Sequence, residues 1–167
     1  QFMSVTFKEV PVSGLWHEDV KSIEVYSKDG SQLYGYLLLD LHPRENKYSH
    51  ACHAGVVPAL QLSDGAKLPD VSVVIANFTK PTKDKPALLK RDEVNTFFHE
   101  FGHAMHALLG ATQLGSFSGT SVKRDFVEMP SQMLEEWLWN KEILKKVSKH
   151  YKTGEPLSDE MIDNILT

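Results

Sequence analysis

The feature that most constrains this chain is a His-Glu-x-x-His pattern formed by His99, Glu100 and His103, in a segment whose apolar residues recur with helical spacing. On an α-helix, residues four positions apart lie about 40° apart in azimuth and about 6 Å apart along the axis, so both imidazoles project from one face. Two neutral imidazoles in this arrangement can share one metal ion, and zinc suits them. Glu100 lies about 100° round the helix, where its carboxylate can reach a metal-bound water as a general base.

The surroundings of the pattern favour a functional interpretation. Residues 91–109 are predicted to form one helix, and Asp92 and Glu93 near its start suit the positive end of the helix dipole. Gly102 lies inside this helix, where glycine costs up to about 1 kcal/mol relative to alanine. We therefore expect something to approach the helix closely at Gly102. The alternative is a pair of core or surface histidines beside an unconnected glutamate.

A catalytic zinc site needs three protein ligands, and two residues compete for the third place. His106 faces nearly the same way as His99 and His103, but it lies about 10 Å along the axis from His99 and cannot share their ion. We expect it to pack in the core or to hydrogen-bond around the site. Glu128 lies 25 positions after His103 in the first turn of a second predicted helix, and the glycine-containing loop 110–121 allows that helix to fold back. The alternative for Glu128 is an acidic residue placed favourably at a helix N-terminus.

Two further polar features are open to more than one interpretation. Asp125 is either a simple helix cap or a carboxylate that orients a ligand imidazole. In the tract 50–53, His50 and Cys52 would share one face of a strand. Donors so close together cannot surround one tetrahedral ion, so we do not expect a metal site in this tract.

The first half of the chain is predicted to be a small, mostly antiparallel sheet. Three segments are rich in β-branched and aromatic residues, and a turn signal at 28–31 joins the last two into a meander. The apolar run 71–78 is typical of a strand that is buried on both faces. The three segments of the meander are 5–10, 22–27 and 32–41.

The second half is predicted to be helical. After helix 91–109, apolar residues at three- and four-residue steps predict a long amphipathic helix that extends to about His150, with Pro130 either near its start or at a kink. Ser158 is a good N-cap for a last helix over 158–167. Strands followed by helices indicate an α+β fold.

Composition excludes several classes of function. The 167 residues are 41% apolar and carry a formal net charge of −4, which gives no electrostatic case for binding nucleic acid or an anionic membrane. No apolar run approaches the roughly 20 residues that span a bilayer. Because Cys52 is the only cysteine, no intramolecular disulfide can form, and the cytoplasm is the expected compartment. Both ends suggest that the chain is part of a larger protein.

Taken together, the motifs resemble the thimet oligopeptidase family of zinc metallopeptidases. The likeness extends from about Trp16 to the end of the chain and rests on highly specific motifs. These are the segments 40–47, 76–82, 99–106, 117–120 and 125–132, with Trp137 following.

The resemblance implies a zincin-like catalytic core and one zinc ion, with residues 1–167 as part of the catalytic domain of a zinc peptidase. His99, His103 and Glu128 correspond to the zinc ligands and Glu100 to the catalytic base. Short peptides are the implied substrates. The family's oxyanion-stabilising His and Tyr residues, and the helical part that encloses its channel, have no match here, and Tyr151 does not correspond to them. The remaining parts of the full-length chain are therefore expected partners.

Three functions follow from the sequence. The first is peptide hydrolysis by a zinc-activated water with Glu100 as the base, and strand 71–78 is expected to hold the substrate backbone by β-augmentation. The second is a folded zinc-binding fragment that is inactive without the rest of its polypeptide. The third is a binding or scaffold protein without catalysis.

Overall fold

The computed structural model describes residues 3–167, and its first half is a five-stranded mixed sheet. Three of its pairings are antiparallel and one, between β3 and β7, is parallel, so the prediction of a mostly antiparallel sheet that starts as a meander is confirmed. In spatial order the strands are β1 (Val5–Val10), β2 (Lys21–Ser27), β3 (Leu33–Asp40), β7 (Asp70–Ile75) and β4 (Cys52–Val57).

The strand β7 lies inside the sheet, between β3 and β4. Its residues Val73 and Val74 are 5% and 0% exposed, which confirms the prediction of a strand buried on both faces. Because both edges of β7 are already paired, our expectation that this strand holds a substrate is wrong. The free edge next to the helices belongs to β4, which the sequence analysis did not predict. A small hairpin of β5 (Leu60–Gln61) and β6 (Lys67–Leu68) follows β4.

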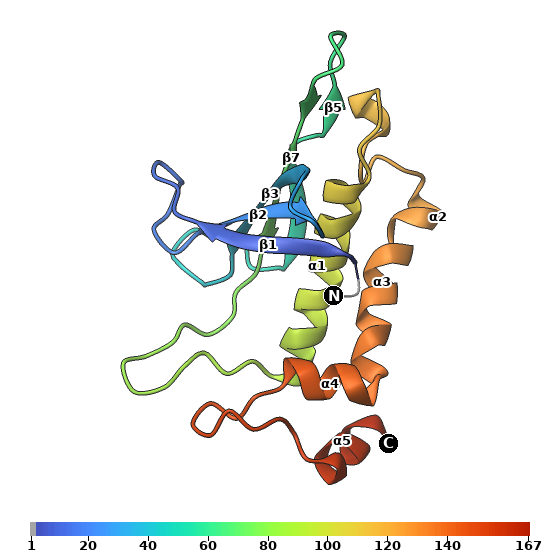
Figure 1. Ribbon diagram of the computed structural model, residues 1–167. Helices are drawn as coiled ribbons and strands as arrows, with labels where there is room; N and C mark the ends of the chain where they lie inside the picture. Colours follow the sequence, from blue (N-terminus) through green and yellow to red (C-terminus); the bar gives the residue numbers. More distant parts are fainter. Residues whose placement is uncertain (1–2) are drawn as a thin grey trace.

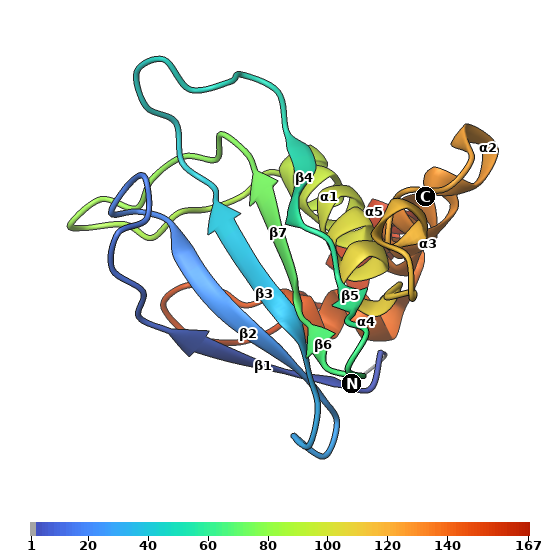
Figure 2. The ribbon, with the colours of Figure 1, turned by 90° about the horizontal axis from the view of Figure 1, so that it is seen from above.

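The helix α1 (Arg91–Leu109) has the predicted bounds and packs between the sheet and α3 (Met129–Glu136) (Figure 1). Seen from above, β4 is the strand at the edge of the sheet nearest to α1 (Figure 2). The main core cluster joins this helix to the sheet, and burial of such side chains stabilises the layer by about 1.5–3 kcal/mol each. Its buried members are Val25, Leu37, Val74, Ala104, Met105 and Leu108.

The predicted long helix up to His150 is wrong, because this part of the chain forms several short helices. They are α2 (Arg124–Val127), α3, the 3₁₀-helix η2 (Trp137–Trp139) and α4 (Lys141–Val147). The helical path ends at Asn140, which adopts an extended conformation, and its side chain accepts hydrogen bonds from the first backbone N–H groups of α4.

Two predictions about helix starts are confirmed. Pro130 lies in the first turn of α3, where its missing N–H costs nothing. Ser158 caps α5 (Asp159–Leu166) by accepting a hydrogen bond from the backbone N–H of Met161. In the part of the chain that the structure describes, no helix has the length and apolar character needed to cross a membrane.

Candidate metal centre

The three predicted ligands lie together between α1 and α3. His99 and His103 project from α1, and Glu128 sits at the junction of α2 and α3. The two Nε2 atoms are 3.2 Å apart, and Oε2 of Glu128 lies 3.3 Å from Nε2 of His99 and 3.2 Å from Nε2 of His103. The three donor atoms thus form a nearly equilateral triangle.

This triangle has the size that a tetrahedral zinc ion requires. Zinc bonds of about 2.0–2.1 Å place any two ligand atoms about 3.3–3.4 Å apart. Two imidazole nitrogens and a carboxylate oxygen at such short separations need a proton or a cation between them, because their lone pairs repel. The side chain of Glu128 is 49% exposed, whereas that of His103 is 12% exposed, so the site is accessible from the side of Glu128. The donor set therefore fits zinc with a fourth position left for water.

Gly102 allows the two helices to approach closely enough for this geometry. A Cβ atom at Gly102 would lie 2.6 Å from Cα of Ser131, a distance that real Cβ atoms do not show. The predicted close approach at Gly102 is confirmed. The glycine thus brings α3, and with it Glu128, against the face of α1 that carries the two histidines.

Ser131 fixes the carboxylate of Glu128. Its hydroxyl is fully buried and lies 3.0 Å from Oε2 of Glu128 and 2.9 Å from the backbone oxygen of the same residue. Because the hydroxyl is the donor to a carboxylate, it holds the oxygen that faces the two imidazoles. This role of Ser131 was not predicted from the sequence.

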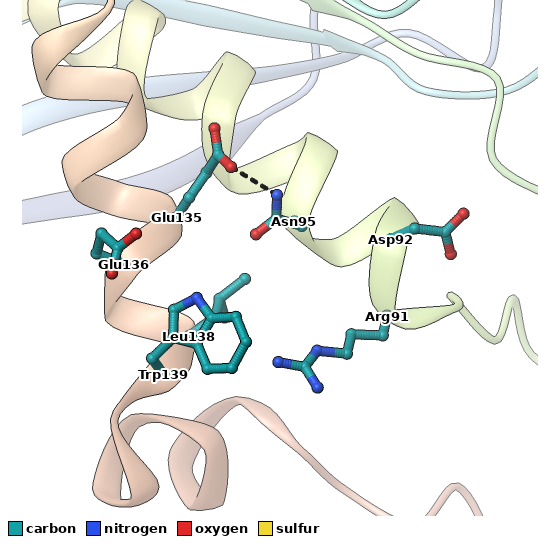
Figure 3. Close-up of a pocket in the computed structure, with 7 residues that line it drawn as sticks. All are labelled: Arg91, Asp92, Asn95, Glu135, Glu136, Leu138 and Trp139. Atoms are coloured by element: carbon teal, nitrogen blue, oxygen red, sulfur yellow. Dashed lines mark hydrogen bonds between the residues drawn. The ribbon is translucent and has the colours of Figure 1, made fainter. Parts of the chain in front are cut away.

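A second carboxylate orients the other side of the site. Oε1 of Glu135 accepts a hydrogen bond from Nδ1 of His99 at 2.5 Å, and Oε2 accepts one from Nδ2 of Asn95 at 2.6 Å. Burial opposes ionisation, but these hydrogen bonds outweigh it and lower the pKa of Glu135. Glu135 also lines a polar pocket of about 570 Å³ between the first turns of α1 and the end of α3 (Figure 3).

Glu135 was not among the predicted site residues, although its spacing from Glu128 in the sequence is a signal for it. Glu135 follows Glu128 by seven positions, which places both carboxylates on one face of a helix two turns apart. Asp125, the carboxylate considered for this task, is exposed on α2 and makes no hydrogen bond or ion pair within residues 3–167. The structure gives the contact with His99 to Glu135 instead.

His106 lies outside the triangle, as expected. Its ring packs against Phe126 of α2 with 5.9 Å between the ring centroids. Burial and the neighbouring His103 lower the pKa of His106.

The carboxylate of Glu100 is partly exposed and makes no hydrogen bond or ion pair in the described part of the chain. The helix α1 contacts β4, and burial, followed by the negative charge of Glu100, raises the pKa of the Cys52 thiol at the start of that strand. Glu100 is the acidic residue of the His-Glu-x-x-His pattern. Its carboxylate therefore has no partner among the described residues and lies on the helix that contacts β4.

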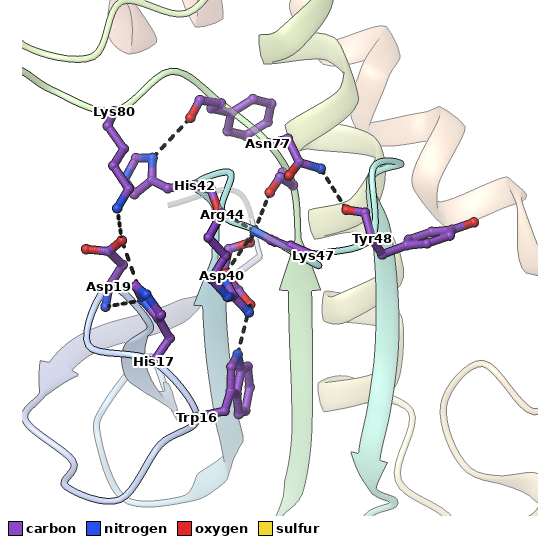
Figure 4. A network of polar contacts seen from close by, with 12 residues as sticks. Trp16, His17, Asp19, Asp40, His42, Arg44, Lys47, Tyr48, Asn77 and Lys80 are labelled. Atoms are coloured by element: carbon purple, nitrogen blue, oxygen red, sulfur yellow. Dashed lines mark hydrogen bonds and ion pairs between the residues drawn. The ribbon is translucent and has the colours of Figure 1, made fainter.

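The start of β4 is anchored by a buried polar network (Figure 4). The carboxylate of Asp40 accepts two hydrogen bonds from Arg44, at 2.7 and 2.8 Å, one from Lys47 at 2.9 Å and one from Trp16 at 2.9 Å. Lys47 also donates to backbone oxygens at the ends of β3 and β7. Asn77 holds the loop that leads into β4 through two backbone carbonyl groups. These contacts involve residues of the motifs at 40–47 and 76–82.

The tract 50–53 forms no metal cluster, since the described residues contain a single group of this kind, the triangle itself. Within the tract, His53 belongs to β4 and points toward α1. Its ring centroid lies 6.3 Å from that of His103, and its Nε2 is 3.1 Å from Oγ of Ser72. Burial, followed by the influence of His103 and His106, lowers the pKa of His53 to about 4.

A His-Glu-x-x-His helix that packs on a mixed sheet, with a glutamate from a following helix completing the set of donors, defines the class of zincin-type metallopeptidases. Comparison with known proteins agrees with this class. The model of peptidase family M3 matches residues 1–167, and the chain belongs to that family.

The curated relatives include proteins named as oligopeptidases. The chain is 46% identical over 169 residues to thimet-like oligopeptidase of Dictyostelium discoideum, an alignment that covers 99% of this chain and 25% of the relative. It is 44% identical over 163 residues to saccharolysin of Saccharomyces cerevisiae (95% and 23%) and 42% identical over 163 residues to oligopeptidase A of Escherichia coli (97% and 24%). The chain therefore spans about a quarter of the length of these relatives.

Proposed function

We propose that this chain carries the hydrolytic centre of a zinc-dependent oligopeptidase that cleaves peptide bonds in short peptides. The observation that carries the proposal is the triangle of donor atoms with sides of 3.2–3.3 Å beside the unpaired carboxylate of Glu100. Membership of peptidase family M3 supports it.

In this proposal His99, His103 and Glu128 hold one zinc ion. When bound, zinc would supply the Lewis acid that polarises a peptide carbonyl and lets a water molecule lose its proton near neutral pH. Two neutral imidazoles and a single carboxylate contribute one negative charge in total, so a site that holds Zn²⁺ would keep a net positive charge. Glu135 and Ser131 keep the donor atoms in place by hydrogen bonds to His99 and Glu128.

Glu100 is the proposed general base. Its carboxylate has no protein partner in the described residues, so it is free to take the proton of the attacking water. It would then return this proton to the amine that leaves when the peptide bond breaks. In this way the single carboxylate of Glu100 performs both proton transfers, and no second residue is needed.

We propose that the substrate backbone binds to the edge of β4 instead of to strand 71–78. The outer edge of β4 is unpaired in the sheet, and the start of this strand lies near Glu100. An extended peptide that adds to this edge would gain backbone hydrogen bonds next to the metal site. The network around Asp40 and Lys47 supports this arrangement by fixing the segment that enters β4.

The remaining parts of a polypeptide of the relatives' length are proposed partners of this chain. A groove of about 1010 Å³ lies between the first turns of α1, the helices α4 and α5 and the segment 148–158. Its wall includes Val147, Tyr151 and Met161, which are 44–56% exposed. Large exposed apolar surfaces of this kind are typical of interaction sites. The relatives contain about three quarters of their length outside the matched region, which supplies a candidate for covering the groove.

The mechanism is tested by Glu100→Gln. We expect the variant to keep one zinc ion per chain and to lose cleavage of a short quenched fluorescent peptide by several orders of magnitude, because the amide cannot take a proton. Glu45→Gln, an exposed position in the loop before β4, is the control and should retain full activity. Undiminished turnover by Glu100→Gln would exclude Glu100 as the base.

The second candidate function is a zinc-binding unit that is inactive without the rest of its polypeptide. The size of the relatives favours it for the isolated chain. Metal content and peptide cleavage, measured for the 167 residues beside a polypeptide of the relatives' length, separate the two. We expect both to bind zinc and the shorter one to cleave weakly or not at all.

The lone cysteine supports the cytoplasm as the proposed compartment, which fractionation of cells expressing a tagged protein would test.

A further inference from the structure

A buried chain of polar side chains runs along the inner face of the sheet toward the metal triangle. On β7, the hydroxyl of Ser72 donates to Oδ1 of Asp70 at 2.5 Å, and it lies 3.1 Å from Nε2 of His53 on the neighbouring strand β4. Ser72 is 0% and Asp70 is 4% exposed. Buried polar groups are costly unless they are paired, so these contacts fix the three side chains relative to the sheet.

The direction of the hydrogen bonds follows from counting protons. A hydroxyl has one proton, and Ser72 gives it to the carboxylate of Asp70. Ser72 must therefore accept from Nε2–H of His53. The buried carboxylate of Asp70 thus sets the orientation of the His53 ring through the hydroxyl of Ser72.

The two ligand imidazoles are held in different ways. A metal-ligating histidine usually donates its second ring N–H to a carboxylate or carbonyl, as His99 does to Glu135. Nδ1 of His103, in contrast, is buried and has no hydrogen-bond partner among residues 3–167. Apart from the contacts of its Nε2 with Glu128 and His99, the His103 ring is therefore oriented by packing.

Two rings supply this packing. The ring of His99 lies 4.8 Å from that of His103, edge to face, and the ring of His53 lies 6.3 Å from it at an interplanar angle of 31°. His99 is itself a ligand on the same helix and follows any shift of α1. His53 belongs to the sheet and is tied to Ser72 and Asp70, so it gives the His103 ring a fixed reference outside the helix.

We propose that His53 is a positioning residue for the metal ligand His103, and that it acts through its anchor on Ser72 and Asp70. The inference rests on the proposed function, since it takes His103 to be a zinc ligand. When the anchor is lost, the His53 ring is free to turn and no longer restricts the His103 imidazole. The His103 ring then adopts orientations in which it does not bind the metal, and the affinity for zinc falls.

The proposal is tested by zinc affinity, measured on the metal-free chain by competition with a chromophoric chelator. Ser72→Ala and His53→Ala should each weaken zinc binding by about tenfold or more, the size found when groups that orient metal ligands are removed. The double variant should bind no more weakly than His53→Ala alone, because Ser72 has no effect on zinc once His53 is absent. Ser22→Ala removes a buried hydroxyl on β2 and is the matched control.

A spectroscopic measurement complements the affinity. With Co²⁺ in place of zinc, the visible absorption band should shift or weaken in Ser72→Ala and remain unchanged in Ser22→Ala, since the band responds to ligand geometry. If far-UV circular dichroism shows that His53→Ala does not fold, His53→Leu fills the same space and replaces it in the double-variant comparison.

The outcomes are distinct. Zinc affinities equal to that of the unsubstituted chain, or fully additive effects of the two substitutions, would overturn the role of His53 while the proposed function stands. Failure of the unsubstituted chain to bind zinc, or undiminished binding by His99→Ala, would overturn the proposed function and the inference together.

Discussion

Nδ1 of His99 donates a hydrogen bond to Oε1 of Glu135 at 2.5 Å, so a residue of α3 determines which nitrogen of a residue on α1 is free. With its proton on Nδ1, the imidazole directs the lone pair of Nε2 toward Glu128 and His103. The carboxylate also makes the imidazole more basic and therefore a better donor to a metal. The contact needs the close packing of the two helices at Gly102.

The first prediction concerns this hydrogen bond. Glu135→Gln should weaken zinc binding by about 10- to 100-fold, because the neutral amide oxygen is a weaker acceptor and no longer stabilises the Nδ1–H form of His99. Competition with a chelator measures the change. Glu136→Gln is the control, because Glu136 lines the same pocket and makes no contact with His99 among the described residues. The zinc affinity of this variant should equal that of the unsubstituted chain. Equal affinities for both variants would show that Glu135 does not orient the ligand.

The second prediction concerns Gly102. Alanine would gain up to about 1 kcal/mol in helix propensity, but its Cβ would lie 2.6 Å from the backbone of Ser131 and force α3 away. Overpacking of this kind costs about 1–3 kcal/mol, and contact with backbone lies at the upper end. We expect Gly102→Ala to destabilise the fold by about 1–2 kcal/mol in urea unfolding and to weaken zinc binding through the displacement of Glu128.

A matched control exists for this substitution. Gly55 on β4 has open space where a Cβ would be built, so Gly55→Ala should leave both stability and zinc affinity nearly unchanged. An increase in stability for Gly102→Ala would mean that the helices can separate at no cost, and that the glycine is not required for their approach.

The elements that could be predicted from the sequence are those with strong local signals. The helix 91–109 combines helical periodicity with acidic residues in its first turn, and the structure reproduces its bounds as α1. The association of His99 with His103 follows from helix geometry alone. Its place in a second predicted helix made Glu128 a candidate third ligand, but only the resemblance to a family favoured it over a residue that merely suits a helix N-terminus, because its position beside the histidines depends on how that helix folds back.

The elements that could not be predicted depend on tertiary contacts. The strand β4 has a short sequence without polar and apolar alternation, and it forms because it pairs with β7. The helix break at Asn140 was missed because apolar residues continue across it with helical spacing, although asparagine is a strong N-cap. The role of Glu135 exists only where α3 packs on α1.

The third prediction concerns the cap at Asn140. Its side-chain oxygen accepts hydrogen bonds from the backbone N–H groups of Glu142 at 2.9 Å and Ile143 at 3.2 Å. Asn140→Ala leaves these donors without their partner and should lower the free energy of unfolding by about 0.5–2 kcal/mol in urea. Zinc affinity should not change, because α4 supplies no ligand. Unchanged stability would indicate that water replaces the cap without loss.

The fourth prediction concerns the pH dependence of stability. Burial opposes ionisation of Asp40, but hydrogen bonds from Arg44, Lys47 and Trp16 outweigh it and hold the pKa of this carboxyl well below its usual range. As the pH falls, the unfolded state, in which an aspartate has a pKa of about 3.9, therefore takes up the proton first. The contribution of Asp40 is fully present above about pH 5 and is lost progressively as the pH falls toward the native pKa.

Asp40→Asn tests this prediction in the metal-free chain. At pH 7 the variant should be less stable by about 3–5 kcal/mol, because Lys47, whose side chain is 3% exposed, keeps a buried charge without its partner. The difference from the unsubstituted chain should narrow as urea unfolding is repeated at pH 5, 4 and 3, since acid protonates Asp40 in the unfolded state of the unsubstituted chain while the native carboxylate stays ionised. Asp84→Asn, an exposed position in the connector before α1, should show no such change with pH. A constant difference over this range would mean that the carboxylate of Asp40 does not couple folding to pH.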